Sequence, residues 1–229
     1  MPVEIQENKC QFCEKCFKQE KTLHVHTCEP GRRHKQKNLA HVRLGLNAFQ
    51  TFFKIAQGAV KDKTYEEFCK SQYYLSFVKF GRYMIDVGCI NPKSYIDWVI
   101  TKNFPLNQWN NDKLYTSYLQ DWVLREDHYD AAQRSLNTMA DWADENNSIF
   151  NHYFLYASTP KIIYDINRGQ ISAWVIFNSV SGREWLEKLS SDELVMIWPM
   201  VNADKWSKMI SLSVQAQKDI TKLLEEAGL

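Results

Sequence analysis

The sequence predicts a mainly α-helical protein, with a small ββα-like metal-binding module at its N-terminal end and a multi-helix, aromatic-rich globular domain after it. Two observations support this fold class. Four of the six cysteines and two of the six histidines lie within residues 10–28, at spacings typical of metal ligands. From about residue 40 onward, apolar residues recur at the spacing of a helix face, and all eight tryptophans lie within residues 98–206. Because tryptophan side chains on helix faces fill core volume, we expect the large aromatic core in the later part of the chain.

Two domains are expected, with their boundary after residue 37. Residues 1–37 contain the metal-binding module and a short basic linker, and residues 38–229 form an all-α helical domain. The linker follows Glu29-Pro30-Gly31, whose proline and glycine are expected to interrupt the chain. Residues 1–43 contain nine Lys and Arg against five Asp and Glu, so this segment has a net charge of +4 and the remainder has −3. Only the N-terminal segment therefore has an electrostatic preference for anions.

The clustered cysteines and histidines predict a tetrahedral metal site. We expect four side chains to bind the metal, in the pattern C-x2-C-x12-H-x-C: Cys10, Cys13, His26 and Cys28. The bound metal would supply folding free energy that a segment of about 25 residues cannot obtain from burial. Because four protein ligands leave no open position for water, one structural Zn²⁺ ion is expected rather than a catalytic one. Cys16 and His24 are alternative ligands.

The same segment resembles the C2H2 zinc-finger superfamily over residues 10–26. Phe17 and Leu23 extend the pattern to C-x2-C-x3-F-x5-L-x2-H, and in that superfamily these two positions form the small core of a ββα finger. The chain departs from the superfamily at the fourth ligand, because Cys28 follows His26 after one residue rather than roughly three to five. Since residues two apart on a helix point in nearly opposite directions, the helix must end near His26 for Cys28 to reach the metal.

The resemblance places three residues at the base-reading positions of the finger helix: Gln19, Thr22 and Val25. Glutamine can pair with adenine, whereas threonine is ambiguous and valine offers only a methyl contact, so a single finger of this kind gives little sequence specificity. Four basic residues of the linker are expected to contact phosphates whatever the sequence: Arg32, Arg33, Lys35 and Lys37. Two alternatives stay open, a solvated hinge for the linker and a protein-docking role for the finger. DNA, RNA and protein are therefore all candidate targets.

Helix signals follow in order along the rest of the chain. Leu44, Ala48, Phe52 and Ile55 mark one face of a helix that is expected to end near Gly58. Further on, a capping box and several N-cap residues mark the starts of other helices. These expected starts are at Thr64 (with Glu67), Asn91 (with Pro92), Asn111, Ser190 or Ser191, Asn202 and Ser213.

Two features remain in the C-terminal half. Gly169 is expected to end a helix as a C′ glycine. Residues 171–177 are β-branched and aromatic, so they fit either a buried strand or a buried helical turn. In total we expect eight to eleven short helices and, apart from this segment, no strand outside the finger.

The chain is not expected to be an enzyme. It contains no phosphate-binding glycine pattern, no G-x-S-x-G and no H-E-x-x-H. His128 and His152 lie in aromatic-rich helical segments and are expected to be core or surface residues. No apolar run is long enough to span a bilayer, and the start of the chain lacks the apolar core of a secretory signal. We therefore expect a cytosolic protein without membrane attachment.

Four stretches carry a resemblance that extends over nearly the whole sequence: residues 10–33, 73–83, 91–98 and 169–178. In these stretches the chain resembles a group of small bacteriophage proteins, chiefly of T4-like and cyanophage viruses. The resemblance implies a phage-encoded accessory factor that acts in the host bacterial cytoplasm, or a virion component. It implies no activity and no site residues.

Two hypotheses follow. In the first, the chain is a non-enzymatic accessory factor of replication, recombination or transcription, and the finger and linker bind nucleic acid or a phage or host complex that processes it. In the second, it is a virion or assembly protein that docks its finger into a neighbouring subunit. The second expects a permanent interface built on four exposed aromatic residues: Tyr73, Tyr74, Trp109 and Tyr153. In both, loss of the metal is expected to unfold residues 10–28 and to leave the helical domain folded.

Overall fold

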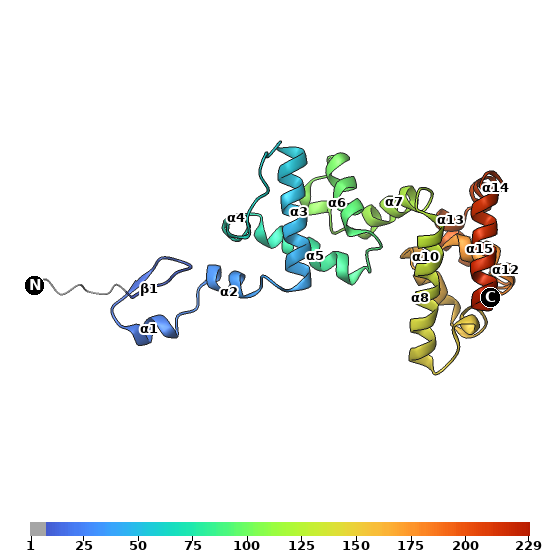
Figure 1. Ribbon diagram of the computed structural model, residues 1–229, viewed down its shortest axis with the longest axis horizontal. Helices are drawn as coiled ribbons and strands as arrows, with labels where there is room; N and C mark the ends of the chain where they lie inside the picture. Colours follow the sequence, from blue (N-terminus) through green and yellow to red (C-terminus); the bar gives the residue numbers. More distant parts are fainter. Residues whose placement is uncertain (1–7) are drawn as a thin grey trace, which may run out of the picture. The chain divides into compact units, whose positions relative to one another are not determined.

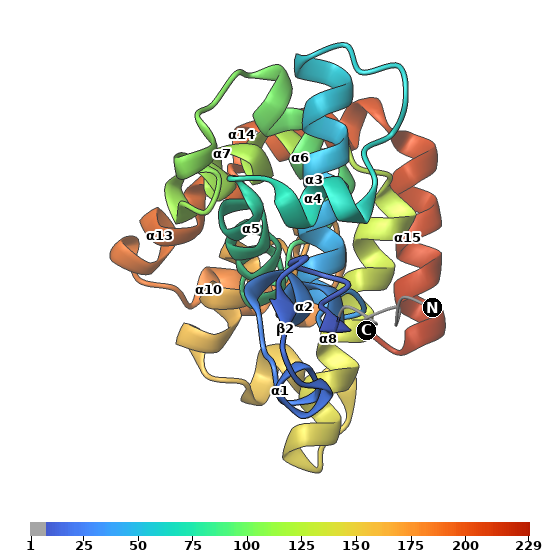
Figure 2. The ribbon, with the colours of Figure 1, turned by 90° about the vertical axis from the view of Figure 1, so that its left-hand side faces the viewer.

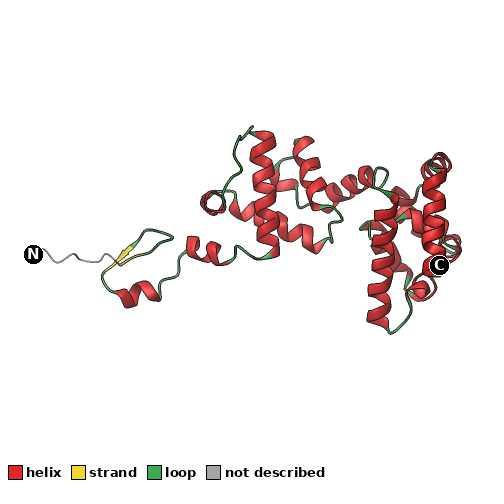
Figure 3. Cartoon of the chain, in the orientation of Figure 1, coloured by secondary structure: helices red, strands yellow, loops and turns green. Residues whose placement is uncertain are grey.

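The structure is a computed structural model that describes residues 8–229. It is helical almost throughout, with one two-stranded sheet near the N-terminal end (Figure 3). The expected fold class, mainly α with a small N-terminal sheet and an aromatic-rich helical core, is confirmed. Over the described residues, no helix has the length and the apolar composition that crossing a bilayer requires.

The chain divides into two compact units, Met1–Asn110 and Asn111–Leu229 (Figure 1). The first unit contains two antiparallel strands, then helices, then one 3₁₀ turn. These are β1 (Asn8–Lys9), β2 (Cys16–Phe17), α1 (Glu20–His24), α2 (Glu29–Lys35), α3 (Ala40–Ala56), α4 (Tyr65–Lys70), α5 (Tyr74–Asp86), α6 (Pro92–Thr101) and η1 (Leu106–Gln108).

This division differs from the expected boundary after residue 37. Residues 38–110 belong with the N-terminal module, and the rest of the expected helical domain forms a unit of its own. The physical reason is that α2 packs against α4, so the N-terminal module is not separated from the helices that follow it. The expected basic linker is part of this difference, because most of it lies inside α2.

The expected helix before Gly58 is present as α3, but of the predicted stripe only Ala48 is buried. Its buried residues are Val42, Gly45, Ala48 and Phe49, whereas Ile55 is 49% exposed. The cause is that α5 crosses the first two turns of α3. There the backbone of α5 approaches residues 41–45 of α3 closely. The predicted stripe continued into the last turn of α3, which α5 does not cover in this way.

Two glycines make the crossing of α3 and α5 unusually close. A Cβ atom built on Gly81 would lie 2.1 Å from the carbonyl oxygen of His41 and 2.8 Å from the backbone nitrogen of Gly45. A Cβ atom on Gly45 would lie 2.7 Å from the carbonyl oxygen of Phe77. Both contacts are with backbone atoms, so no side chain can move aside to make room. The two helices therefore reach this separation only because both positions lack a side chain.

Aromatic side chains fill the interior of the first unit. The ring centroid of the buried Trp109 lies 5.8 Å from that of Phe77 and 5.2 Å from that of Phe80. The polar atoms of this cluster are paired, since the indole N–H of Trp109 donates to the Phe104 carbonyl (2.8 Å) and the Tyr95 hydroxyl donates to the Trp109 carbonyl (2.8 Å). This cluster therefore combines aromatic packing with satisfied hydrogen bonds.

The second unit contains helices and no strand over residues 111–229, and α8 and α15 lie side by side in it (Figures 1 and 2). Its elements are α7 (Asp112–Trp122), α8 (His128–Asn146), η2 (Phe150–His152), α9 (Tyr153–Tyr156), α10 (Thr159–Asn167), α11 (Ala173–Asn178), α12 (Val180–Glu187), α13 (Ser191–Val201), α14 (Ala203–Leu212) and α15 (Val214–Ala227). The helices outnumber the eight to eleven expected, because several are only one or two turns long.

Most of the expected helix signals are confirmed. Side chains cap helix N-termini at the predicted residues Thr64, Asn91, Asn111, Ser190 and Asn202. Ser213 precedes α15 but makes no capping hydrogen bond through its side chain. Gly169 has φ +75° after α10, as a C′ glycine should. The open question over residues 171–177 is settled as helix, because α11 begins at residue 173 and is almost wholly buried.

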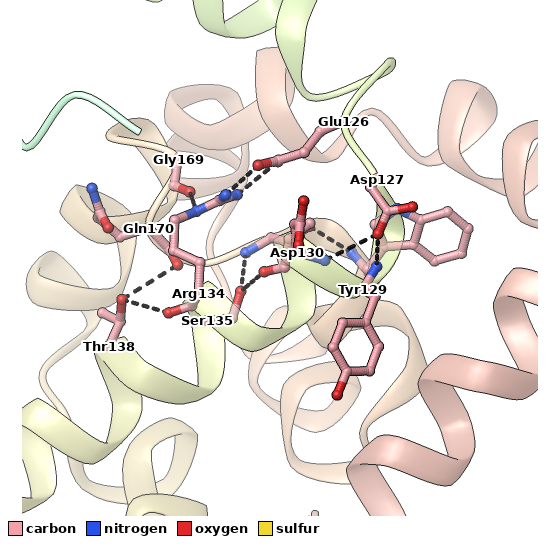
Figure 4. A network of polar contacts seen from close by, with 12 residues as sticks. Glu126, Asp127, Tyr129, Asp130, Arg134, Ser135, Thr138, Gly169 and Gln170 are labelled. Carbon is pink, nitrogen blue, oxygen red and sulfur yellow. Dashed lines mark hydrogen bonds and ion pairs between the residues drawn. The ribbon is translucent and has the colours of Figure 1, made fainter. Parts of the chain in front are cut away.

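A polar network joins the start of α8 to the turn between α10 and α11 in the second unit (Figure 4). The guanidinium of Arg134 donates to both carboxylate oxygens of Glu126, and its Nε donates to the carbonyl of Gly169 at 2.8 Å. The Ser135 hydroxyl accepts a hydrogen bond from the backbone N–H of Ser172 at 2.8 Å. These bonds fix the turn that leads into the buried helix α11.

Candidate metal centre

A tight turn between β1 and β2 positions the first two cysteines. The strands pair Asn8 with Phe17 and Lys9 with Cys16. Beyond the strands, the backbone N–H of Cys10 donates to the Lys15 carbonyl and that of Glu14 donates to the Cys10 carbonyl, both at 2.9 Å. Glu14 takes a left-handed conformation with φ +60° to close the turn. As a result Cys10 and Cys13 stand on one compact loop, facing the same space.

The second pair of ligands follows a short helix. Helix α1 ends at His24, and Val25 is its C-cap. The expectation that the helix ends near His26 is confirmed, and the chain is free to turn so that both His26 and Cys28 face the loop. The Phe17 ring supports this turn, with its centroid 4.7 Å from that of the His26 imidazole.

The four expected ligand atoms converge. The Sγ atoms of Cys10 and Cys28 are 3.8 Å apart, Cys13 Sγ lies 3.2 Å from His26 Nε2, and all four ligand atoms lie within 4.8 Å of one another. Two sulfurs bound tetrahedrally to one ion at about 2.3 Å each would be about 3.8 Å apart, so the spacing fits. These residues, named the Cys/His quartet below, could hold one metal ion.

The alternative ligands lie outside this group. Cys16 is exposed, with its Sγ 3.9 Å from the carbonyl of Glu14, and His24 is exposed on α1. Among the residues that the structure describes, the Cys/His quartet is the group whose donor atoms converge as metal ligands do.

The backbone around the quartet affects the two cysteines differently. Backbone N–H groups of Cys13 and Phe12 point at the Cys10 sulfur and lower the pKa of its thiol. Burial raises the pKa of the Cys28 thiol, and the N–H of Gly31, 3.4 Å from the sulfur, offsets part of that rise. Because a metal binds the thiolate, the loop that carries Cys10 is prepared for a metal ion by its own backbone.

Cys28 is also the N-cap of α2, which corrects the expectation of a chain break and basic linker after it. Its sulfur accepts the Gly31 N–H, and Pro30 lies within the first turn, where a proline costs no hydrogen bond. Glu29 forms ion pairs with Arg32 (2.5 Å) and Arg33 (3.0 Å), one turn further on. These arginines lower the pKa of Glu29. Proline and glycine therefore begin a helix here rather than interrupt the chain.

The residues expected to contact nucleic acid differ in their exposure and in their partners within the protein. Gln19 and Thr22 are exposed at the start of α1, and Lys35 is exposed at the end of α2. Arg32 is exposed and paired with Glu29. Lys37 is exposed too, although its Nζ lies 5.3 Å from the centre of the Tyr65 ring.

Arg33 differs from the other basic residues because it is turned toward the helices of the first unit. Its side chain is only 18% exposed, and it donates from Nη1 to the carbonyl of Cys69 at 2.6 Å. Its guanidinium carbon lies 4.4 Å from the centre of the buried Tyr74 ring. Sequence reasoning missed these partners, since they lie more than 30 residues along the chain and no local pattern marks them.

The two histidines singled out in the second unit form ordinary structural contacts. His128 Nε2 lies 3.7 Å from the carboxylate of Asp219, which ties the start of α8 to α15. His152 Nδ1 lies 3.5 Å from the hydroxyl of Ser148. Both belong to the packing of helices, as expected of core or surface residues.

The same unit contains a cavity of about 670 Å³ between α7, α10 and α13. Arg168, which lines it, pairs with Asp112 at 3.5 Å and lies over the ring of Tyr164. The guanidinium of Arg168 thus already has partners among the residues that line the cavity.

Comparison with protein-family models, with curated proteins and with solved structures finds no match to this chain.

Proposed function

We propose that the Cys/His quartet binds one structural Zn²⁺ ion and that the chain is a non-enzymatic accessory factor, which binds nucleic acid or a nucleic-acid-processing protein complex through its N-terminal module. The convergence of three thiols and one imidazole within 4.8 Å is the observation that supports this most directly. The processes served are replication, recombination or transcription. The resemblance to phage proteins supports the host bacterial cytoplasm as the place of action.

Zinc is the metal that suits the donor set best. Soft thiolate ligands together with one imidazole favour Zn²⁺ over the hard cations that prefer oxygen ligands. Four protein ligands close the tetrahedron, so the ion would stabilise the fold of the module and would not activate water. Metal analysis of the purified protein, with native mass spectrometry before and after chelation, tests this. A stoichiometry other than one zinc per chain would contradict the proposal.

The exposed basic residues of the module support nucleic acid as its target. Lys18 precedes the exposed Gln19 and Lys21 precedes the exposed Thr22, and the charges of these two lysines would favour phosphate. In and just after α2, fewer residues are proposed as phosphate contacts than the sequence suggested. Arg32, Lys35 and Lys37 are offered as phosphate contacts, whereas the contacts of Arg33 with Cys69 and Tyr74 favour a role within the protein.

Filter binding to single- and double-stranded DNA and RNA across a salt series tests this target. Each lost phosphate contact should lower the slope of log affinity against log salt by about 1. Lys35→Ala should therefore weaken binding to all sequences alike, and Lys188→Ala, which removes an exposed lysine of the second unit, is the matched control. Absence of binding at low salt would overturn the nucleic-acid version and leave a protein target.

A virion or assembly role is the second candidate, and it now depends on different residues. Tyr74, Trp109 and Tyr153 are buried in the core and cannot form an interface, while Tyr73 is 45% exposed. What favours a protein partner is the exposed side of α13, where Val195 is 71% exposed and Trp198 is 45% exposed. Mass spectrometry of purified phage particles tests it, since absence of the chain from particles would exclude this role.

A further inference from the structure

We infer that α2 is a metal-coupled clasp: it is attached at its first turn to the Cys/His quartet and along its side to α4 and α5, so that metal binding and the docking of α2 stabilise each other. The inference rests on the metal binding proposed above and goes beyond it, because it assigns Arg33 and Tyr65 to the transmission between the metal site and the helices of the first unit.

The attachment to the quartet occurs through Cys28 and Gly31. Cys28 is at once an expected ligand and the N-cap of α2. Gly31 packs closely against the Cys28 sulfur and the Phe12 ring. A Cβ atom at this position would lie 3.2 Å from that sulfur and 3.0 Å from the ring. The Phe12 ring, on the loop between the first two cysteines, also packs against His34 with centroids 5.0 Å apart. The first turn of α2 is thus built on the metal-binding loop itself.

The attachment to the helices of the first unit occurs mainly through Arg33. The hydroxyl of the buried Tyr65, on α4, donates to the carbonyl of Arg33 at 2.5 Å. The guanidinium of Arg33 in turn donates to the carbonyl of Cys69 at the end of α4, and its central carbon lies 4.4 Å from the centre of the Tyr74 ring on α5. The edge of the Tyr65 ring also faces His34, with centroids 6.4 Å apart. Arg33 therefore joins three helices.

Coupling follows because α2 cannot hold its shape alone. It has seven residues, and an isolated helix of that length is unstable in water. Each attachment fixes the same short helix, so each lowers the cost of making the other. Such coupling is reciprocal: the factor by which metal binding favours docking of α2 equals the factor by which docking favours metal binding. A substitution that weakens docking should therefore also weaken metal binding, by at most that factor.

Two pairs of matched variants test the coupling through metal affinity, measured by competition of the full-length protein with a chromophoric zinc chelator. Arg33→Met and Arg32→Met both remove an ion pair with Glu29, but only the first removes the contacts with α4 and α5. We expect the first to weaken zinc binding about tenfold and the second less than about twofold. Tyr65→Phe removes one hydroxyl and should weaken zinc binding about fivefold. Its control is Tyr73→Phe, which removes the hydroxyl of an exposed tyrosine at the start of α5 and should leave zinc binding unchanged.

The reverse direction is tested by hydrogen exchange. Cys13→Ser removes a ligand that lies in the turn between β1 and β2, and it should raise the exchange rate of α4 amides about as much as chelation does, while α6 amides stay protected. Unchanged zinc affinity in Arg33→Met and Tyr65→Phe, or unchanged α4 exchange without metal, would overturn the clasp and leave zinc binding intact. Absence of zinc binding by the unaltered chain would overturn both, and failure to bind nucleic acid would leave the clasp standing.

Discussion

Replacing Gly81 by alanine should destabilise the first unit strongly, although alanine is the better helix former. In an open helix position the change would stabilise the protein by about 1 kcal/mol. Here the added Cβ atom would lie 2.1 Å from the His41 carbonyl oxygen, where ordinary contact begins near 3.4 Å. The helices α3 and α5 must therefore separate by about 1 Å, since close-packed interiors do not absorb such an overlap.

The cost of that separation can be estimated from the core that depends on it. Overpacking alone costs about 1–3 kcal/mol. Moving α5 outward also weakens the packing of the buried side chains of Phe77, Phe80 and Met84. This lost core packing adds to the cost in free energy of unfolding. After the gain in helix propensity is subtracted, we expect a net loss of about 2–3 kcal/mol in the free energy of unfolding. For a unit of this size the melting temperature should fall by about 10–20 °C.

Calorimetry of the full chain measures the shift, and hydrogen exchange shows whether it is confined to the first unit. Asn47→Ala, at an exposed position of α3, is the matched control and should change the melting temperature little. Gly45→Ala should act in the same direction, and the double variant should lose less than the sum, because the first substitution already parts the helices. A melting temperature equal to or above that of the unaltered protein would show that the crossing tolerates a side chain and would refute the reasoning.

Three further predictions concern the polar groups and the metal. Arg134→Met should destabilise the second unit by about 2–3 kcal/mol, because it leaves the buried carboxylate of Glu126 without its guanidinium, whereas Arg125→Met at an exposed position should have little effect; urea unfolding compares the two. Lys63 and the backbone N–H of Thr64 hold the pKa of Glu67 below its usual value, so its stabilisation is present above the unfolded pKa of about 4.3 and is lost as pH falls through the folded pKa. The difference in urea midpoint between the unaltered chain and Glu67→Gln should therefore shrink between pH 6 and pH 3, and a constant difference would contradict this. Chelation should unfold residues 10–28 and release α2 while leaving tryptophan fluorescence and most helical circular dichroism unchanged, and a loss of the whole cooperative melt would instead show that the module is needed by both units.

The metal site could be predicted from the sequence because its geometry is local. Cys10 and Cys13 share one turn, and the short spacing from His26 to Cys28 forces the helix to end where it does. Capping residues such as Thr64 and Ser190 were predictable for the same reason, since a cap bonds to residues two or three positions away.

Other features could not be predicted because they depend on contacts far along the chain. Pro30 and Gly31 are typical of a break, and nothing in their neighbourhood shows that Cys28 caps a helix there. Arg33 belongs to a basic run, yet its partners at Cys69 and Tyr74 withdraw it from solvent. The division of the chain at residue 110 likewise reflects which helices pack together, and no change in composition marks it.

The dual use of Cys28, as metal ligand and as the first cap of α2, limits how the length of this segment can vary. Each residue of a helix turns its side chain by about 100°, so a single insertion between Cys28 and Arg33 would rotate the arginine away from Tyr74. A deletion would do the same in the opposite sense, even with all four ligands retained. The loop of residues 57–63 carries no such constraint on rotation. Among relatives that share this architecture, insertions and deletions should therefore collect in that loop and be absent from residues 28–33.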